Sequence, residues 1–144
     1  MKKDNDGHYA EKHPFGSEAD PRVVNALKQG ASDGKIPCAV AFKIASELGV
    51  APEIVGQTTD LLEFRLAKCQ MGLFGYRPNK RIVQAAQEVS RELETSIREE
   101  LKKDRLPCKR AWGIAKKFGM RKMAVASACE ALEIKINACQ LGAF

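Results

Sequence analysis

Residues 108–125 read CKRAWGIAKKFGMRKMAV, and this spacing predicts two helices joined by a tight turn. Apolar residues recur at helical intervals before Gly119, and glycine suits the left-handed residue that ends a helix. Ala115 is small enough to let a second helix cross closely, and Val125 is placed to anchor that helix on the core. Both helices would pack through these few residues.

The same pattern occurs seventy residues earlier in the chain. Residues 34–74 align without gaps on residues 104–144, and 13 of the 41 aligned pairs are identical. Both copies end in similar segments, KCQMGLF at 68–74 and ACQLGAF at 138–144. A gapless match of this length predicts two tandem units.

The residues around each helix pair predict the remaining elements. Residues 63–71 and 133–141 alternate between apolar and polar, which is typical of strands. Residues 20–31 and 81–103 carry apolar stripes, and the second predicts a long helix joining the units. Because each lone strand needs a partner for its backbone groups, we expect the two to pair antiparallel about a pseudo-twofold axis. A homodimer that swaps or extends this pairing is the alternative.

The expected fold is therefore mainly α with short strands, in the α+β class. It consists of two tandem helix-turn-helix-strand repeats about the pseudo-twofold axis, joined by the long helix. Residues 1–17 form a polar tail, residues 18–76 the first unit, and residues 77–144 the joining helix with the second unit.

Composition restricts the partners. The chain has 144 residues and a formal net charge of +6, which favours a polyanion such as nucleic acid. No apolar run approaches the roughly 20 residues that cross a bilayer, so no membrane partner is expected. The first residues, MKKDNDGHYAEKHPFG, lack the apolar stretch of a signal peptide, which predicts a cytoplasmic protein.

The pattern A-x3-G-x5-V carries a resemblance to known proteins. It occurs as Ala45, Gly49 and Val55 and again as Ala115, Gly119 and Val125. This pattern, with a helix before it and a strand after it, resembles the helix-turn-helix superfamily of DNA-binding regulators, in a tri-helical or winged-helix form. The resemblance implies a transcriptional regulator that binds double-stranded DNA.

The two units differ in charge. Residues 34–76 hold four basic and four acidic residues, whereas residues 104–144 hold eight basic and three acidic ones. Acidic side chains such as Glu53 and Asp60 would be repelled by phosphate, so we assign nucleic-acid binding to the second unit. The first unit would complete the core, and Val40, the counterpart of a basic residue, suggests a protein interface there. The expected DNA contacts, mostly to phosphate, are Lys109, Arg110, Lys116, Lys117, Arg121 and Lys122.

The helical wheel directs Ala111, Ile114, Ala115 and Phe118 of the second unit toward the core. Trp112 is interpreted as a core residue rather than a surface for stacking bases. The alternative to DNA binding is that the basic residues form only a solvated face.

Four cysteines recur with the repeat, and each pair is separated by 31 residues. Reduced cysteines are commonly buried, which is the simplest interpretation. A four-thiol metal site and redox pairing are the alternatives. The candidate residues are Cys38, Cys69, Cys108 and Cys139, whereas Cys129 has no cysteine counterpart and is expected only to pack.

Enzymatic chemistry has little support in the sequence. Both histidines, His8 and His13, fall in the polar tail, and neither unit contains a phosphate-cradling glycine loop or a nucleophile–base set. We therefore expect neither an enzyme nor a cofactor. The alternatives to a DNA-binding protein are an adaptor module of the same fold and a thiol-based metal or redox sensor.

Overall fold

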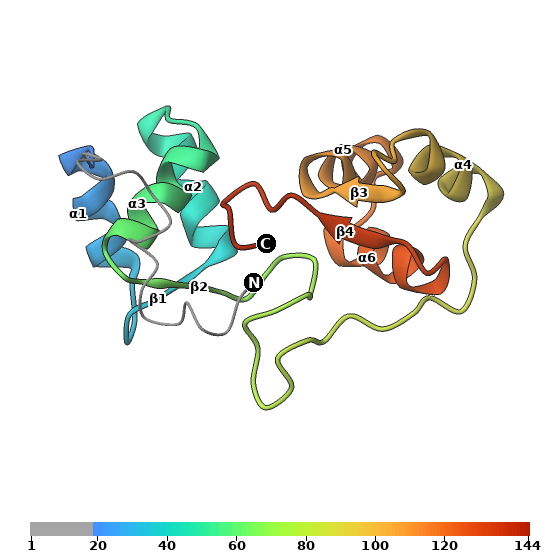
Figure 1. Cartoon of the computed structure of the whole chain (residues 1–144), viewed down its shortest axis with the longest axis horizontal. Coiled ribbons are helices and arrows are strands. Elements are labelled where there is room, and N and C mark those ends of the chain that lie inside the picture. Colours follow the sequence, from blue (N-terminus) through green and yellow to red (C-terminus); the bar gives the residue numbers. More distant parts are fainter. Residues whose placement is uncertain (1–18) are drawn as a thin grey trace. The chain divides into compact units, whose positions relative to one another are not determined.

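The computed structural model of the chain describes residues 19–144, and among them six helices and four short strands (Figure 1). This composition confirms the α+β class with a predominance of helix. The expected tail, with His8 and His13, lies outside the described residues.

The described chain forms two compact units. Unit 1 comprises residues 19–69 together with Gln140–Ala143, and unit 2 comprises Gln70–Cys139 together with Phe144. The division falls after Cys69 rather than after residue 76, and the segment after the last strand belongs to unit 1. The expected boundaries therefore differ from the observed ones.

The elements follow the same order in both units. Unit 1 contains α1 (Pro21–Gly30), β1 (Lys35–Pro37), α2 (Cys38–Leu48), α3 (Pro52–Leu61) and β2 (Arg65–Ala67). Unit 2 contains α4 (Arg91–Glu99), β3 (Arg105–Pro107), α5 (Cys108–Phe118), α6 (Lys122–Ala131) and β4 (Lys135–Asn137).

The turns between the paired helices have the geometry that the sequence pattern predicts. Gly49 ends α2 at φ 66° and ψ 33°, and Gly119 ends α5 at φ 63° and ψ 34°. Both are in the left-handed region, where a side chain would be strained. Val55 and Val125 are 0% exposed and anchor the second helix of each pair in its core.

The strands pair within each unit, so the expected antiparallel pairing of the two lone strands is wrong. β1 pairs with β2 in parallel, with Ile36 opposite Leu66, and β3 pairs with β4 in the same way. The sequence interpretation missed β1 and β3, which are three-residue strands directly before a helix. A winged form needs an antiparallel hairpin after the second helix, and the parallel pairing does not provide one.

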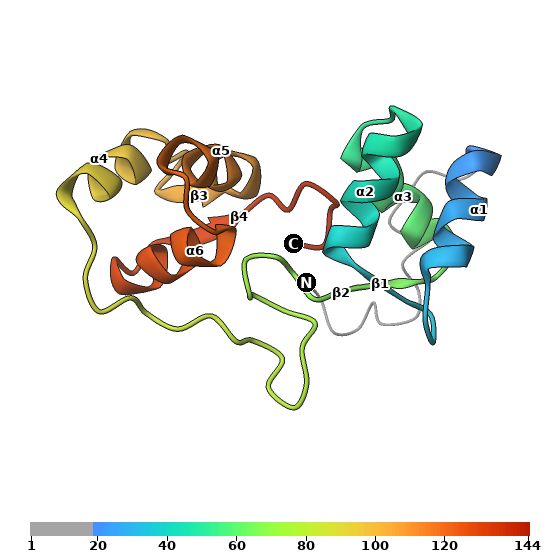
Figure 2. The same cartoon turned by 180° about the vertical axis from the view of Figure 1, so that it is seen from behind.

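The expected long helix over 81–103 is also wrong, because only Arg91–Glu99 is helical. The backbone N–H groups of Ile82 and Val83 donate to the Gly72 carbonyl, and that of Ala86 donates to the Ser127 carbonyl at 2.9 Å. These bonds hold the segment in an extended form beside α6, as both views show (Figures 1 and 2). Ser90 then caps α4 by accepting from the Leu93 N–H at 3.1 Å.

Two Gln-x-Gly segments, residues 70–72 and 140–142, complete the cores. In unit 1, Leu141 is 2% exposed and crosses α3 at Gly56, where an added Cβ would lie 2.0 Å from the Leu141 carbonyl oxygen. In unit 2, Met71 is 0% exposed, and Gly72 lies against the Met123 side chain of α6. Each unit therefore contains the segment that follows the last strand of the other half of the sequence.

Candidate nucleic-acid interface

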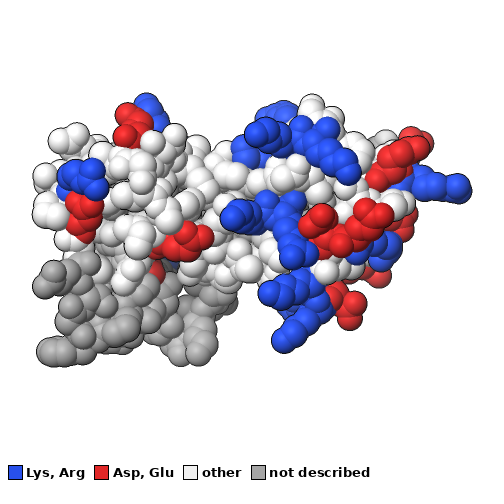
Figure 3. Space-filling view, turned by 90° about the horizontal axis from the view of Figure 1, so that it is seen from above, with Lys and Arg blue, Asp and Glu red and all other residues white. Residues whose placement is uncertain are grey.

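The six basic residues expected to bind DNA lie on α5, on the turn after it and at the start of α6. Lys109, Lys116, Lys117 and Arg121 are exposed, and none of them forms an ion pair with another described residue. Lysine and arginine side chains gather over this part of unit 2 in Figure 3. The structure thus leaves a large part of the predicted positive charge open to solvent.

The basic residues of α5 divide into two stripes. Residues three, four and seven apart share one side of a helix, so Lys109, Trp112, Gly113 and Lys116 form one stripe. This stripe borders the start of α6, where Arg121 and Lys122 lie. We call the set of Lys109, Lys116, Arg121 and Lys122 the phosphate surface. The second stripe contains Arg110 and Lys117.

Arg110 has a structural partner that the sequence did not reveal. Its guanidinium donates to the Glu100 carbonyl at 3.0 Å, at the residue that ends α4. A cation there satisfies an open carbonyl and complements the negative end of the helix dipole. The equivalent contact in unit 1 is apolar, since a Cβ on Gly30 would lie 3.0 Å from Val40. Val40 thus lies against α1 and is half-buried, and the interface that the sequence suggested there stays a prediction.

Lys117 faces the acidic side of α4. A hollow of about 460 Å³ brings it together with Glu92, Glu99 and Phe118. Phe118 is 37% exposed, so its expected place in the core is wrong. The helical wheel predicted that Phe118 points inward, but Phe118 is the last residue of α5 and lies at the rim of this hollow. The carboxylates of Glu92 and Glu99 lower the positive potential around Lys117.

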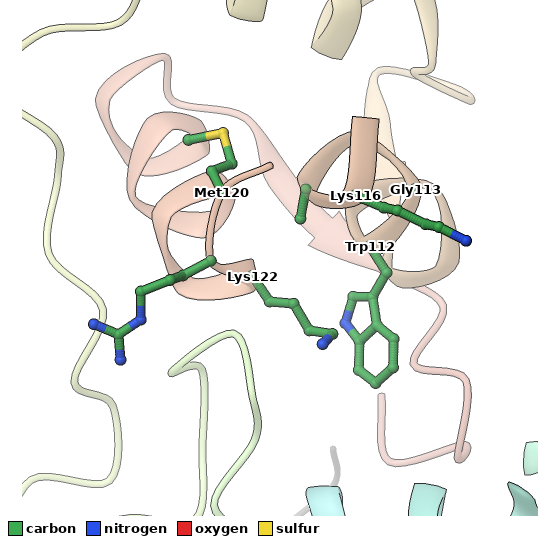
Figure 4. Close-up of a pocket in the computed structure, with 7 residues that line it drawn as sticks. Trp112, Gly113, Lys116, Met120 and Lys122 are labelled. Atoms are coloured by element: carbon green, nitrogen blue, oxygen red, sulfur yellow. The ribbon is translucent and has the colours of Figure 1, made fainter. Parts of the chain in front are cut away.

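A second hollow of about 440 Å³ lies between α5 and the start of α6. Its walls come from Trp112, Gly113, Ala115, Lys116, Met120, Arg121 and Lys122. Figure 4 shows Lys122 reaching toward Trp112, whereas Lys116 extends away from it. The Lys122 Nζ lies 4.5 Å from the centre of the Trp112 ring, a cation–π contact. We call this site the Trp112 hollow.

The start of α6 adds to the positive potential. The N-cap residue is Arg121, which makes no side-chain cap, and the first turn contains no acid. By contrast, Asp20 caps α1 and Ser90 caps α4. The Lys122 and Met123 N–H groups bond to no other described residue. Open N–H groups at a helix start attract anions, so here they add to the positive potential of the basic side chains.

One side of α6 packs into the core of unit 2. Val125, Ala126, Ala128 and Cys129 are at most 2% exposed, and Ala131 is the only exposed residue of the helix. Arg81 pairs with Glu130, which fastens the segment before α4 onto the helix. In a helix-turn-helix protein the second helix enters the major groove. In this conformation Ser127 and Glu130, on the partly exposed side of α6, already bond to the segment before α4, which limits access to the helix.

Sequence reasoning set Trp112 aside as a core residue, yet it is half-buried and lines the hollow. A signal was present, because Trp112 is the only tryptophan of the chain and stands beside a glycine within a run of basic residues.

The four candidate metal-binding cysteines do not form a cluster. No group of three or more histidine, cysteine or acidic residues that would hold a metal occurs within residues 19–144. Each unit contains two of the four cysteines, at the start of its first paired helix and after its last strand. All except the half-buried Cys139 are buried, in keeping with packing.

Comparison with models of protein families, with curated proteins and with solved structures finds no match for this chain. Among the described residues, no helix has the length and apolar character needed to span a bilayer.

Proposed function

We propose that this protein binds nucleic acid through the phosphate surface of unit 2. The observation that supports this most is that Lys109, Lys116 and Arg121 are exposed on one side of unit 2 without an acidic partner among the described residues. When exposed lysine and arginine side chains neutralise the phosphates of a nucleic acid, they release its bound counterions. This counterion release is the main source of sequence-independent affinity.

Double-stranded DNA is the expected partner, and the contacts are to its backbone. Reading of an operator by a recognition helix is disfavoured, because the segment before α4 already bonds to Ser127 and Glu130 on the partly exposed side of α6. Phosphate contacts position a protein on DNA but carry no sequence information. The proposed activity is therefore sequence-independent binding. A homodimer and a cytoplasmic location stay predictions from the sequence.

Salt dependence tests this proposal. Four phosphate contacts give a slope of about −3.6 for log K against log salt, so affinity for a blunt duplex falls about 100-fold between 50 and 200 mM salt. Lys116→Glu combined with Arg121→Glu should reduce the magnitude of the slope by about 2 and weaken binding more than tenfold at low salt. Fluorescence anisotropy with a labelled duplex measures both quantities.

The matched control is Lys102→Glu combined with Lys135→Glu. Both residues are exposed in unit 2, and both lie outside α5 and its turn with α6. The two double variants have the same net charge, so any difference between them reports the location of the charge. Equal losses of affinity would show that net charge alone attracts DNA, and salt-independent binding would remove the proposal.

A further inference from the structure

The Trp112 hollow has features that phosphate binding does not use. Its volume, about 440 Å³, is within the roughly 300–1,000 Å³ of sites that accept small organic ligands. One wall is aromatic, and Met120 and Ala115 add apolar surface. A phosphate surface needs none of these side chains. The hollow therefore suits a ligand that combines a flat apolar group with an anion.

The floor of the hollow is open. Gly113 lines the hollow beside Trp112. A Cβ added to Gly113 would meet no atom within 4 Å, so the space next to the indole is empty of protein atoms. Its rim carries Lys116, Arg121 and Lys122, and no acidic residue lines the site. Negative charge and an aromatic ring can thus be accommodated side by side, which is the chemistry of a nucleotide.

We propose that the Trp112 hollow binds one unpaired nucleotide, with its base stacked on the Trp112 indole and its phosphate held by Arg121 and Lys122. This inference rests on the proposed function and specifies which form of nucleic acid the site prefers. A strand end or an overhang provides such a nucleotide, whereas a blunt duplex keeps its bases paired and stacked.

Lys122 now occupies the place of the base. Its ammonium lies over the indole at 4.5 Å, and a lysine head on a flexible stem moves readily. Stacking of a base on an aromatic side chain stabilises more than an exposed cation–π contact does, so the exchange is favourable. The displaced ammonium then meets the phosphate at the start of α6, next to the open N–H groups of Lys122 and Met123.

Unit 1 provides an internal comparison. Phe42 stands at the position of Trp112, but Lys43 replaces Gly113 and Ser46 replaces Lys116. Ala51 and Pro52 stand where Arg121 and Lys122 would be. The equivalent place in unit 1 therefore lacks the open floor and the cationic rim, and we expect it to bind no nucleotide.

Three DNA ligands test the inference: a blunt duplex, the same duplex with a three-nucleotide overhang, and that overhang with abasic sites. We expect the overhang to bind about tenfold tighter than the blunt duplex, and the abasic overhang to lose this gain. Binding of the overhang should quench the fluorescence of Trp112, the only tryptophan in the chain.

Variants separate stacking from folding. Trp112→Leu should remove the gain, so that this variant binds the overhanging and blunt duplexes equally well, and Trp112→Phe should keep part of the gain, since a phenyl ring still stacks. Phe42→Leu in unit 1 is the control and should keep the whole gain. Circular dichroism and thermal unfolding establish that each variant is folded.

The outcomes distinguish the two proposals. Equal affinity for blunt and overhanging duplexes, or a gain that survives Trp112→Leu, overturns the nucleotide site but leaves phosphate binding intact. Failure to bind any of the three ligands, or binding without salt dependence, overturns the proposed function itself. A gain lost equally in Trp112→Phe and Trp112→Leu also contradicts stacking.

Discussion

At the residue scale, Cys129 shows how burial sets chemistry that composition does not reveal. It is 1% exposed on α6, and the loss of hydration raises the pKa of its thiol from its ordinary 9.0 to about 11. Its counterpart in unit 1 is Thr59, whose hydroxyl donates to the Val55 carbonyl at 2.8 Å. A hydroxyl therefore fits a helix at this position, which makes Cys129→Thr a conservative replacement.

The raised pKa predicts a loss of stability at alkaline pH. Below pH 9 the thiol is protonated in both the folded and unfolded states, so it has no effect. Between about pH 9 and pH 11 the unfolded chain loses a proton that the folded chain keeps, and unfolding becomes more favourable. At pH 10.5 this lowers the free energy of unfolding by about 2 kcal/mol.

Urea unfolding at pH 8.5 and pH 10.5, for the natural chain and Cys129→Thr, measures this contribution. Other groups that titrate in this range are common to both proteins and cancel in the comparison. The natural chain should lose about 2 kcal/mol more than the variant. Parallel pH profiles would contradict a buried, neutral thiol.

At the element scale, local patterns predicted the paired helices well. Ala45, Gly49 and Val55 act within a few residues of one another, and the left-handed glycine and the buried valine follow from that spacing. β1 and β3 could not be predicted in this way, because each strand is three residues long and its partner lies about thirty residues further along.

In the candidate site, too, features set by the local sequence could be predicted and features set by tertiary packing could not. Exposure of Lys109, Lys116 and Arg121 could be predicted from charge and helical period. The partner of Arg110 depends on where α4 ends, and the half-burial of Trp112 depends on how the start of α6 packs. Both are tertiary facts that a helical wheel does not contain.

Ser90 distinguishes the expected long helix from the observed short one. In the structure it is the N-cap of α4, so Ser90→Ala should lower the free energy of unfolding by about 1 kcal/mol. Inside a continuous helix the same change would be neutral or stabilising, because alanine is the better helix former. Urea denaturation gives the sign, and increased stability in Ser90→Ala would contradict the observed start of α4.

At the scale of the whole molecule, the two Gln-x-Gly segments are similar in sequence and belong to units that the sequence did not predict. QMGLF, residues 70–74, follows β2 yet belongs to unit 2, and Gln140–Ala143 follow β4 yet belong to unit 1. Similar segments fit similar surfaces, so the sequence alone does not decide which surface each one covers. The backbone of Gly56 decides it for Leu141.

A double-mutant cycle tests this assignment. In the full chain Gly56→Ala places a methyl group against the Leu141 carbonyl, and the overpacking should cost about 1–3 kcal/mol. In a chain that ends at Cys139 the obstacle is gone, and the same substitution should stabilise α3 by up to about 1 kcal/mol through helix propensity. Urea unfolding and hydrogen exchange of the α3 amides measure the change. In the truncated chain the effect of Gly56→Ala is measured against the same truncated chain with glycine, so the free-energy cost of the truncation itself cancels. An equal effect of Gly56→Ala in both chains would mean that Leu141 does not lie on α3.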